Sequence, residues 1–279
     1  MNEIIHGNHL DVLKRYPDDC FDMFLTSPPY DKLRDYEGYD FQFEPLAHEL
    51  YRTLKPGGVG VWVVNDATIN GSETLTSAKQ KIFFREECCF NIWDTMIYEK
   101  NGSAYPTKDR YYQVFEYIFV LSKGKPSSIR LLKDRKNRFS GKDAKWSLKH
   151  SDRQKDGTLK VRKRKSNTPE YGIRFNIWKY STGYGYQDND GFSSEHPATF
   201  PEKLAEDHIL SWSNPGDVVL DPMCGSGTTC KMAVKHQRQY VGIDCSEKYC
   251  ELARKRLERF TSQTTIFDTV SDTRENACV

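Results

Sequence analysis

The strongest constraint on the fold is one segment near the C-terminal end of the chain. Its pattern predicts a strand over residues 217–220, a helix over 228–235 and a second strand over 240–243. A glycine turn separates the first strand from the helix, and each strand is followed by an acidic residue, Asp221 and Asp244. This is a βαβ crossover of a Rossmann-like sheet, in which ligands bind beyond the carboxyl ends of the strands.

The residues of this crossover indicate which ligand it binds. Gly225 and Gly227 let the backbone approach a ligand closely, and the helix that begins at Thr228 offers unpaired N–H groups. The third glycine of a dinucleotide fingerprint and the Gly-Lys-Ser/Thr of a P-loop are both missing. Asp244 follows Gly225 by 19 positions and is suited to hold two ribose hydroxyls. A nucleoside without a pyrophosphate, such as S-adenosylmethionine, fits best; the alternative is an unliganded unit with Asp244 facing solvent.

The remaining apolar runs extend the same alternation over most of the chain. Further strands are predicted at residues 3–6, 21–25, 59–64, 91–98 and 114–121, and further helices at 10–16, 43–54, 75–90, 201–212 and 247–260. Ser246 is the predicted N-cap of the last helix, and the polar residues after 260 are predicted to fray. Such alternation predicts a mostly parallel sheet that helices cover on both faces.

A second motif follows the strand predicted at residues 21–25 and reads Thr26-Ser27-Pro28-Pro29-Tyr30. The two prolines fix the backbone, so the Ser27 hydroxyl and a carbonyl of Ser27 or Pro28 form a rigid pair of acceptors. Such acceptors can hold the N–H bonds of a nucleobase amine and disperse the charge that develops as it attacks a methyl sulfonium. The Tyr30 ring can stack on a base that has left the duplex. The alternative is a proline-rich turn without a catalytic role.

A basic stretch separates the two motifs. Residues 123–165 contain 17 Lys and Arg against four acidic residues, and aromatic residues follow directly at Tyr171, Phe175, Trp178, Tyr180, Tyr184 and Tyr186. Cations beside aromatic rings favour binding to the phosphates and bases of nucleic acid over binding to a membrane. A solvated loop is the alternative.

Composition excludes other classes of protein. The formal net charge of the 279 residues is only +2, so overall charge identifies no partner. The eight cysteines include no Cys-x-x-Cys pair, and no His cluster has zinc-ligand spacing, so we predict free thiols and no metal site. The sequence lacks a membrane-spanning apolar run and a signal peptide, which predicts a cytoplasmic protein.

Taken together, these motifs resemble those of the β-class amino-methyltransferases of DNA, which modify cytosine N4 or adenine N6. Residues 26–30 look like the catalytic [SD]-P-P-[YF] motif, residues 221–229 like the S-adenosylmethionine loop, and Asp244 like the ribose-binding acid. Residues 54–58 and 196–204 match two further family motifs. The catalytic motif precedes the cofactor loop, which is the permuted order of the β class.

The resemblance implies a role for each matched residue. Ser27, Pro28, Pro29 and Tyr30 would be catalytic. The cofactor would be bound by Asn8, Phe200, Asp221, Pro222, Cys224, Gly225, Ser226, Gly227, Thr228, Asp244 and Cys245. Asn8 stands where the family often has an Asp that contacts the adenine amine. The expected organisation is a catalytic half (1–122), a basic target-recognition insertion (123–195), a cofactor-binding half (196–260) and a polar tail (261–279).

We therefore predict site-specific methylation of double-stranded DNA with S-adenosylmethionine as cofactor. Ser27 favours cytosine N4, because an Asp at that position leans toward adenine N6 in the family; adenine N6 is the alternative. Two lesser alternatives are an inactive DNA-binding regulator and an NAD-linked oxidoreductase of the same fold. A cognate restriction endonuclease is a conceivable partner, and the sequence leaves the oligomeric state open.

Overall fold

The computed structural model describes residues 1–29, 41–102, 108–138, 140, 151–161, 168–181 and 201–275. The chain divides into two compact units. One comprises Met1–Arg130 together with Asn176–Val279, and the other comprises Leu131–Phe175. The first unit therefore takes in the ends of the predicted insertion, and the second unit lies wholly within it.

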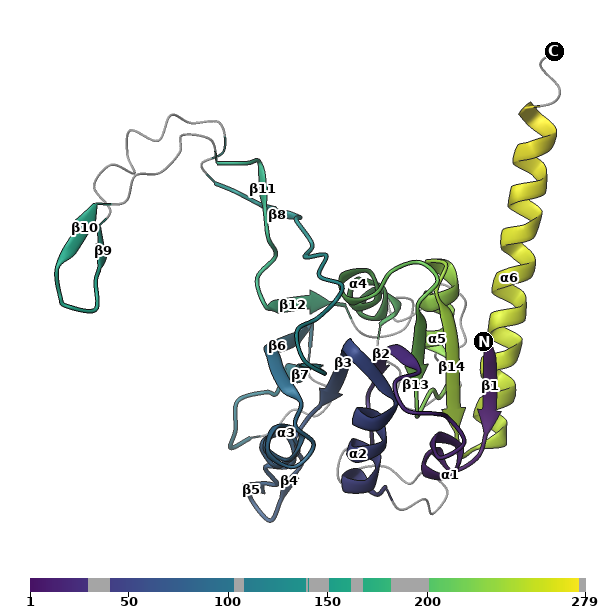
Figure 1. Cartoon of the computed structure of the whole chain (residues 1–279), viewed down its shortest axis with the longest axis horizontal. Helices are drawn as coiled ribbons and strands as arrows, with labels where there is room; N and C mark the ends of the chain where they lie inside the picture. Colours follow the sequence, from purple (N-terminus) through teal and green to yellow (C-terminus); the bar gives the residue numbers. More distant parts are fainter. Residues whose placement is uncertain are drawn as a thin grey trace. The chain divides into compact units, whose positions relative to one another are not determined.

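The first unit is built on an eight-stranded sheet with the order β1-β14-β13-β2-β3-β7-β6-β12 (Figure 1). Its strands are β1 (Glu3–His6), β2 (Phe21–Thr26), β3 (Leu54–Val64), β6 (Asn91–Lys100), β7 (Phe115–Ser122), β12 (Ile177–Tyr180), β13 (Val218–Asp221) and β14 (Gln239–Asp244). All neighbouring pairs are parallel except β3–β7 and β7–β6, so within this sheet β7 alone runs the opposite way. The predicted mostly parallel sheet is confirmed.

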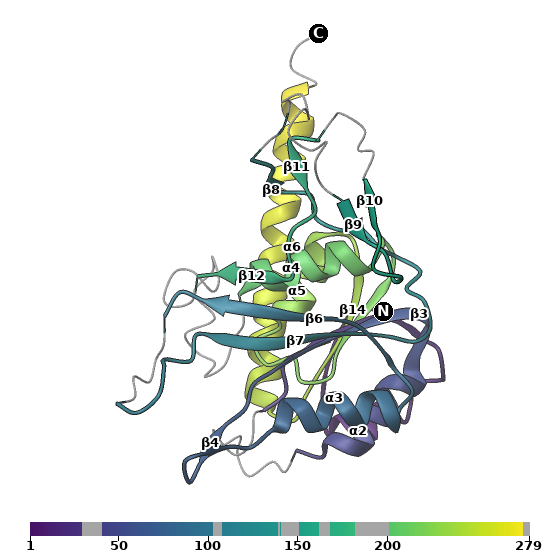
Figure 2. The ribbon, with the colours of Figure 1, turned by 90° about the vertical axis from the view of Figure 1, so that its left-hand side faces the viewer.

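Helices cover both faces of this sheet, as the alternation predicts (Figures 1 and 2). One face packs against α1 (His9–Leu13), α2 (Phe43–Thr53) and α3 (Thr76–Glu86). The other packs against α4 (Glu202–Trp212), α5 (Thr228–Lys235) and α6 (Glu247–Glu275). The α2 side buries the larger core, where Phe24, Trp62 and Phe84 are fully enclosed.

The strand order determines where a ligand can bind. From β13 the chain continues through α5 to β14 on one side, whereas from β2 it continues through α2 to β3 on the other. The border between β13 and β2 is therefore the point at which the strand order reverses. In open α/β sheets the carboxyl ends of the strands on either side of this point form the ligand crevice.

Several elements differ from their predicted bounds, and β3 and α6 differ the most. The strand predicted at 59–64 already begins at Leu54, because Leu54 pairs with Phe21 and Val59 pairs with Met23, so the breaker residues 55–58 form an irregularity within β3. Helix α6 does not fray after residue 260 but continues to Glu275. No Gly or Pro occurs between Glu247 and Glu275, so nothing in the sequence stops the helix.

The predicted aromatic cluster is divided between the two units. Trp178 and Tyr180 lie on β12 and are buried in the first unit, where Trp178 stacks on His208 at a ring-centroid distance of 4.6 Å. These two side chains are therefore core residues and not exposed stacking platforms. Tyr171 and Phe175 belong to the second unit and are exposed, whereas Tyr184 and Tyr186 lie outside the described residues.

In its described residues, the second unit contains two short antiparallel strand pairs. Strand β8 (Arg135–Lys136) pairs with β11 (Tyr171–Gly172), and β9 (Ser151–Arg153) pairs with β10 (Leu159–Val161). In the part of the chain that the structure describes, no helix is long and apolar enough to cross a bilayer.

Candidate functional site

The two motifs found in the sequence meet at the border between β13 and β2. Leu220 pairs with Phe24, so the carboxyl ends of the two strands lie side by side. The last residue of each strand then contacts the other: the Thr26 hydroxyl donates a hydrogen bond of 2.8 Å to Asp221 Oδ1. Thr26 is 0% exposed and Asp221 is 2% exposed, so water does not compete for this bond. A direct buried contact thus joins the serine-proline motif to the glycine turn.

Backbone hydrogen bonds shape the glycine turn itself. The Gly225 N–H donates to Asp244 Oδ2 at 2.8 Å, and the Ser246 N–H donates to the other oxygen of the same carboxylate at 2.9 Å. The Cys224 N–H donates to the Ile243 carbonyl at 2.8 Å. The turn between β13 and α5 is therefore fastened to the end of β14, and the half-buried Asp244 carboxylate lies directly against it.

The two glycines of the turn are required by its geometry. Gly225 has φ of 49° and Gly227 has φ of 77°, which is the left-handed region that other residues rarely adopt. A Cβ atom on Gly227 would also lie 3.0 Å from the Cβ of Ala253 on α6. The turn can thus pack closely under the helix only with glycine at this position.

The serine-proline motif is described as far as residue 29. Ser27 and Pro29 are half-buried and Pro28 is buried, directly after the end of β2. Tyr30 lies outside the described residues, and so does Phe200, the predicted aromatic residue of the cofactor pocket.

The other predicted cofactor residues surround the glycine turn. Pro222, Cys224, Ser226 and Thr228 are buried, and Cys245 is exposed next to Asp244. Asn8 follows β1, where His6 pairs with Asp244, so it lies at the same edge of the sheet. Its side-chain carbonyl accepts a hydrogen bond of 2.8 Å from the Leu10 N–H and caps α1, a role that the sequence analysis did not assign.

Burial changes the electrostatics of this site. It raises the pKa of Asp221 to about 6, because the low-polarity surroundings disfavour the carboxylate. The hydrogen bonds from Thr26, Thr229 and the Met223 N–H lower the pKa in part, whereas the negative charge of Asp244 raises it. For the Cys224 thiol, the neighbouring Cys230 and burial raise the pKa well above its usual value, which makes this thiol a poor nucleophile.

Hydrogen bonds define two helix starts near the site. Ser246, the predicted N-cap of α6, does not cap it with its side chain: its buried Oγ has no hydrogen-bond partner among the described residues, while the carboxylate of Asp244 accepts its N–H. At the end of β3, Asp66 accepts hydrogen bonds of 2.7 Å from both the N–H and the hydroxyl of Ser77, so it caps the first turn of α3.

Thr26 is not among the site residues predicted from the sequence. A usable signal was present, since Thr26 ends an apolar strand in the same way that Asp221 ends another. The neighbouring position of the two strands, however, is a tertiary property that no local pattern contains.

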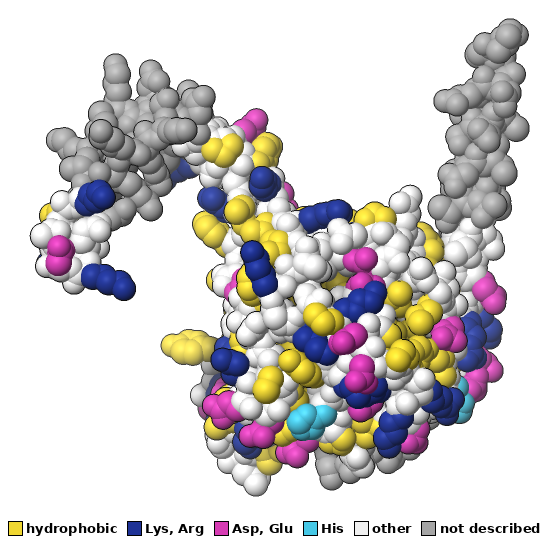
Figure 3. Space-filling model, viewed as in Figure 1, with side chains coloured by type: hydrophobic (Ala, Val, Ile, Leu, Met, Phe, Trp, Pro, Cys, Tyr) yellow, Lys and Arg dark blue, Asp and Glu magenta, His cyan; other side chains and the backbone are white. Residues whose placement is uncertain are grey.

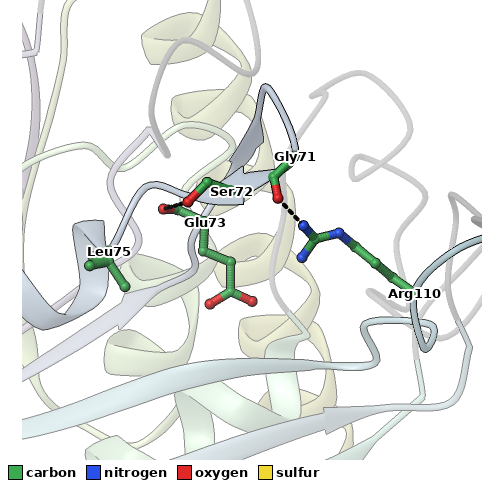
Figure 4. A pocket seen from close by; sticks show the side chains of 5 residues that line it. All are labelled: Gly71, Ser72, Glu73, Leu75 and Arg110. Atoms are coloured by element: carbon green, nitrogen blue, oxygen red, sulfur yellow. Dashed lines mark hydrogen bonds between the residues drawn. The ribbon is translucent and has the colours of Figure 1, made fainter.

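A separate surface hollow lies at the β4–β5 hairpin (Thr68–Ile69 and Ser72–Glu73), which follows β3. It is lined by Gly71, Ser72, Glu73, Leu75 and Arg110, and the Arg110 guanidinium points to the Gly71 carbonyl and donates a hydrogen bond to it (Figure 4). No described residue of the two motifs lines this hollow. Among the described residues, no three His, Cys, Asp or Glu side chains are grouped so that they could hold a metal ion.

Surface charge differs between the two units. On the face of the first unit visible in Figure 3, Lys and Arg side chains alternate with Asp and Glu, and no broad region of one sign appears. Many charged side chains of the first unit form ion pairs, such as Lys55 with Asp22 at 2.7 Å and Lys179 with Glu99 at 2.6 Å. The second unit lies within the basic stretch, and its Arg135 lies over the Phe175 ring at 4.4 Å.

The mostly parallel sheet, with a glycine turn and an acidic residue at the point where the strand order reverses, has the Rossmann-like architecture of S-adenosylmethionine-dependent methyltransferases. The model of the DNA methylase family matches residues 21–255, so the chain belongs to this family of S-adenosylmethionine-dependent enzymes. It is 53% identical over 244 residues to the orphan methyltransferase M.BamHII of Bacillus amyloliquefaciens, covering 87% of this chain and 91% of the relative. It is 27% identical over 270 residues to the DNA adenine methyltransferase YhdJ of Escherichia coli, covering 91% and 82%.

Solved structures share the fold. The PvuII cytosine-N4-specific DNA methyltransferase superposes with a TM-score of 0.67 at 19% identity, covering 94% of this chain and 91% of that one. A DNA modification methylase from Thermus thermophilus in complex with S-adenosylmethionine superposes with a TM-score of 0.61 at 23% identity, covering 93% and 94%. The Rossmann-like methyltransferase fold is thus confirmed.

The described residues fit S-adenosylmethionine. The half-buried Asp244 carboxylate accepts two backbone N–H groups. Because a carboxylate oxygen can accept more than one hydrogen bond, the two oxygens can also accept from ribose hydroxyls. The left-handed glycines expose backbone next to it, and α5 begins at Thr228. These features suit a ligand whose ribose lies against Asp244.

Proposed function

We propose that this protein is a site-specific DNA methyltransferase that modifies the exocyclic N4 amine of cytosine in double-stranded DNA. When bound, S-adenosylmethionine would supply a methyl group on a cationic sulfur. The new N–C bond to the amine would form as the S–C bond breaks and leaves S-adenosylhomocysteine, and the nitrogen would lose one proton to solvent water.

The observation that carries the proposal is the hydrogen bond from Thr26 to Asp221. A direct methyl transfer requires that the target base and the methyl donor meet within a few ångströms, since positioning supplies much of the acceleration. Ser27 and Pro28 follow Thr26 directly, and Pro222 to Gly227 follow Asp221. One buried contact therefore fixes the distance between the proposed base site and the proposed cofactor site.

In this proposal the serine-proline motif orients the amine. The Ser27 hydroxyl and a backbone carbonyl of Ser27 or Pro28 accept its N–H bonds and stabilise the positive charge that develops on the nitrogen. Pro28 and Pro29 keep these acceptors in place because their backbone angles are fixed. Tyr30 stacks on the base after it leaves the duplex.

The cofactor residues act on the other side of the contact. Asp244 holds the ribose, the backbone of Gly225 and Gly227 approaches the nucleoside, and Phe200 stacks on the adenine. Asn8, Pro222, Cys224, Ser226, Thr228 and Cys245 complete the proposed pocket. Residues 123–195 form the proposed target-recognition insertion, and side chains such as the half-buried Arg135 and the exposed Phe175 suit phosphate and base contacts.

The assignment of cytosine rests on Ser27. A neutral hydroxyl suffices for the cytosine N4 amine, whereas an Asp at this position leans toward adenine N6 in the family. The same chemistry on adenine N6 is the second candidate, because the family contains enzymes of both kinds and the relative YhdJ is named an adenine methyltransferase.

The direct test is Ser27→Ala in the full-length protein, with duplex DNA and isotope-labelled S-adenosylmethionine. Digestion to nucleosides and mass spectrometry should show N4-methyl-2′-deoxycytidine with the wild-type protein and a loss of about 10²-fold or more in rate with the variant. The affinity for S-adenosylhomocysteine, measured by calorimetry, should be unchanged. Unaltered turnover by Ser27→Ala would refute the catalytic role, and methylated adenine would assign the other base.

A further inference from the structure

A buried group of charges lies behind the glycine turn and comes from three separate segments. Arg256 on α6 is 1% exposed, Lys231 on α5 is 5% exposed, and Glu202 at the start of α4 is 9% exposed. The Arg256 guanidinium donates to Glu202 Oε1 at 2.7 Å, and the Lys231 ammonium donates to the same oxygen at 2.5 Å. We call these three residues the buried charge cluster.

The second guanidinium nitrogen of Arg256 contacts the glycine turn. It donates to the Ser226 carbonyl at 3.1 Å, to the Ser226 hydroxyl at 3.2 Å and to the Thr228 hydroxyl at 3.0 Å. Ser226 lies between the two left-handed glycines, and Thr228 begins α5. The buried side chain of Arg256 is thus hydrogen-bonded both to the glycine turn and to Glu202, the first residue of α4.

We propose that Arg256 is a positioning residue for S-adenosylmethionine. Its fork holds the Ser226 carbonyl away from the cofactor side of the turn and keeps the turn in register with the start of α4. Phe200, the proposed adenine-stacking residue, precedes Glu202 by two positions. The buried charge cluster therefore joins the glycine turn to the start of α4, the helix that follows Phe200 in the sequence. This inference rests on the dependence of the family on S-adenosylmethionine and not on which base is methylated.

The geometry requires arginine and not merely a cation. A guanidinium reaches Glu202 with one nitrogen and the turn with another, whereas an ammonium is a single point charge. Arg256→Lys keeps the buried charge and its partner Glu202, so it avoids leaving an uncompensated carboxylate. The lysine ammonium nevertheless cannot reach both Glu202 and the glycine turn, so this substitution tests the connection between them.

The chain offers a matched control in Arg238. This arginine is also buried, at 5% exposure, and it donates to the Ser213 carbonyl at 2.6 Å, the Ser213 hydroxyl at 3.0 Å and the His236 carbonyl at 2.6 Å. None of these bonds involves the glycine turn. Arg238→Lys therefore removes a comparable set of hydrogen bonds without touching the proposed cofactor site.

The experiment compares Arg256→Lys and Arg238→Lys with the wild-type protein by calorimetry with S-adenosylhomocysteine and by steady-state kinetics. Arg256→Lys should raise the Kd and the KM for S-adenosylmethionine about tenfold, with kcat at saturating cofactor within about twofold of wild type. Arg238→Lys should lower Tm by about as much as Arg256→Lys does, but it should leave the Kd and the KM unchanged. An unchanged Kd in Arg256→Lys, or an equal rise in both variants, would overturn the proposal.

A measurement on the wild-type protein covers the case in which Arg256→Lys does not fold. Addition of S-adenosylhomocysteine should slow amide hydrogen exchange in residues 224–230 and also in 200–206 and 254–258. Protection confined to the glycine turn would contradict a coupling through Arg256. If S-adenosylhomocysteine binds in this way but no methylated cytosine forms, the proposed function fails while the role of Arg256 stands.

Discussion

Replacement of Thr26 by valine removes the contact that joins the two halves of the site and almost nothing else. Valine has nearly the same shape as threonine, so the packing at the end of β2 is retained. The lost group is the hydroxyl that donates a hydrogen bond of 2.8 Å to Asp221. Neither of the two residues has more than 2% of its surface exposed to solvent. The Asp221 carboxylate then loses one of its donors in surroundings that water does not reach.

The magnitude follows from the nature of this bond. A buried hydrogen bond to a charged group contributes about 2 kcal/mol, which corresponds to a decrease in Tm of about 4 to 8 °C for a chain of this size. The effect on catalysis should be larger. A misplacement of reacting groups by about 1 Å costs ~10²-fold in rate, and Ser27 is attached directly to the residue that has lost its anchor.

The assay combines thermal unfolding, calorimetry with S-adenosylhomocysteine and initial rates on duplex DNA. Thr53→Val is the matched control, because Thr53 is 1% exposed and its hydroxyl donates 2.8 Å to the Glu49 carbonyl within α2, away from the site. We expect both variants to lose stability, but only Thr26→Val to lose kcat, by about 10- to 100-fold. If the two variants retain equal activity, the Thr26–Asp221 contact does not align the site.

Two further predictions concern the glycine turn and its acid. The pKa of Asp221 is raised from 3.8 to about 6, so between these pH values the folded state binds more protons than the unfolded state. The free energy of unfolding therefore falls by about 3 kcal/mol as the pH rises across this range. Asp221→Asn should therefore flatten this dependence and raise Tm at pH 7.5 relative to wild type; superimposable profiles of Tm against pH would contradict the shift. Gly227→Ala should raise the KM for S-adenosylmethionine at least tenfold. The φ of 77° costs a residue with a Cβ about 1–2 kcal/mol, and the new Cβ would lie only 3.0 Å from that of Ala253. Wild-type affinity in a folded variant would show that the turn does not hold the cofactor.

The alternation of apolar runs and breakers predicted the six helices and seven of the eight strands of the large sheet, but it missed β12, which lies within the predicted insertion. Helix α5 has its predicted bounds, and β1, β2 and β14 differ from theirs by no more than a residue at an end. These elements have strong local signals, such as the glycine turn before Thr228. The predicted fraying after residue 260 was wrong. It rested on the polar composition of this segment alone, whereas no helix-breaking residue ends α6 before Glu275.

The site was predictable as motifs but not as contacts. Glycines at 225 and 227 and an acid at 244 follow from what a nucleoside requires of a βαβ turn. The hydrogen bond between Thr26 and Asp221 joins residues 195 positions apart. The hydrogen bonds of Arg256 join it to residues 28 to 54 positions away. No local pattern in the sequence specifies these contacts. Trp178 shows the converse, because an aromatic residue near a basic stretch resembled a nucleic-acid contact and is buried against His208.

The central claim is tested most directly by the DNA of a methylation-free bacterial host that expresses the full-length chain. Modification-resolved sequencing should find N4-methylcytosine at one recurring short sequence, and none in a matched culture that expresses Ser27→Ala at the same level. Methylated adenine at a recurring sequence would contradict the assignment of cytosine. Unmodified DNA in the presence of folded wild-type protein that binds S-adenosylhomocysteine would contradict the proposed activity itself.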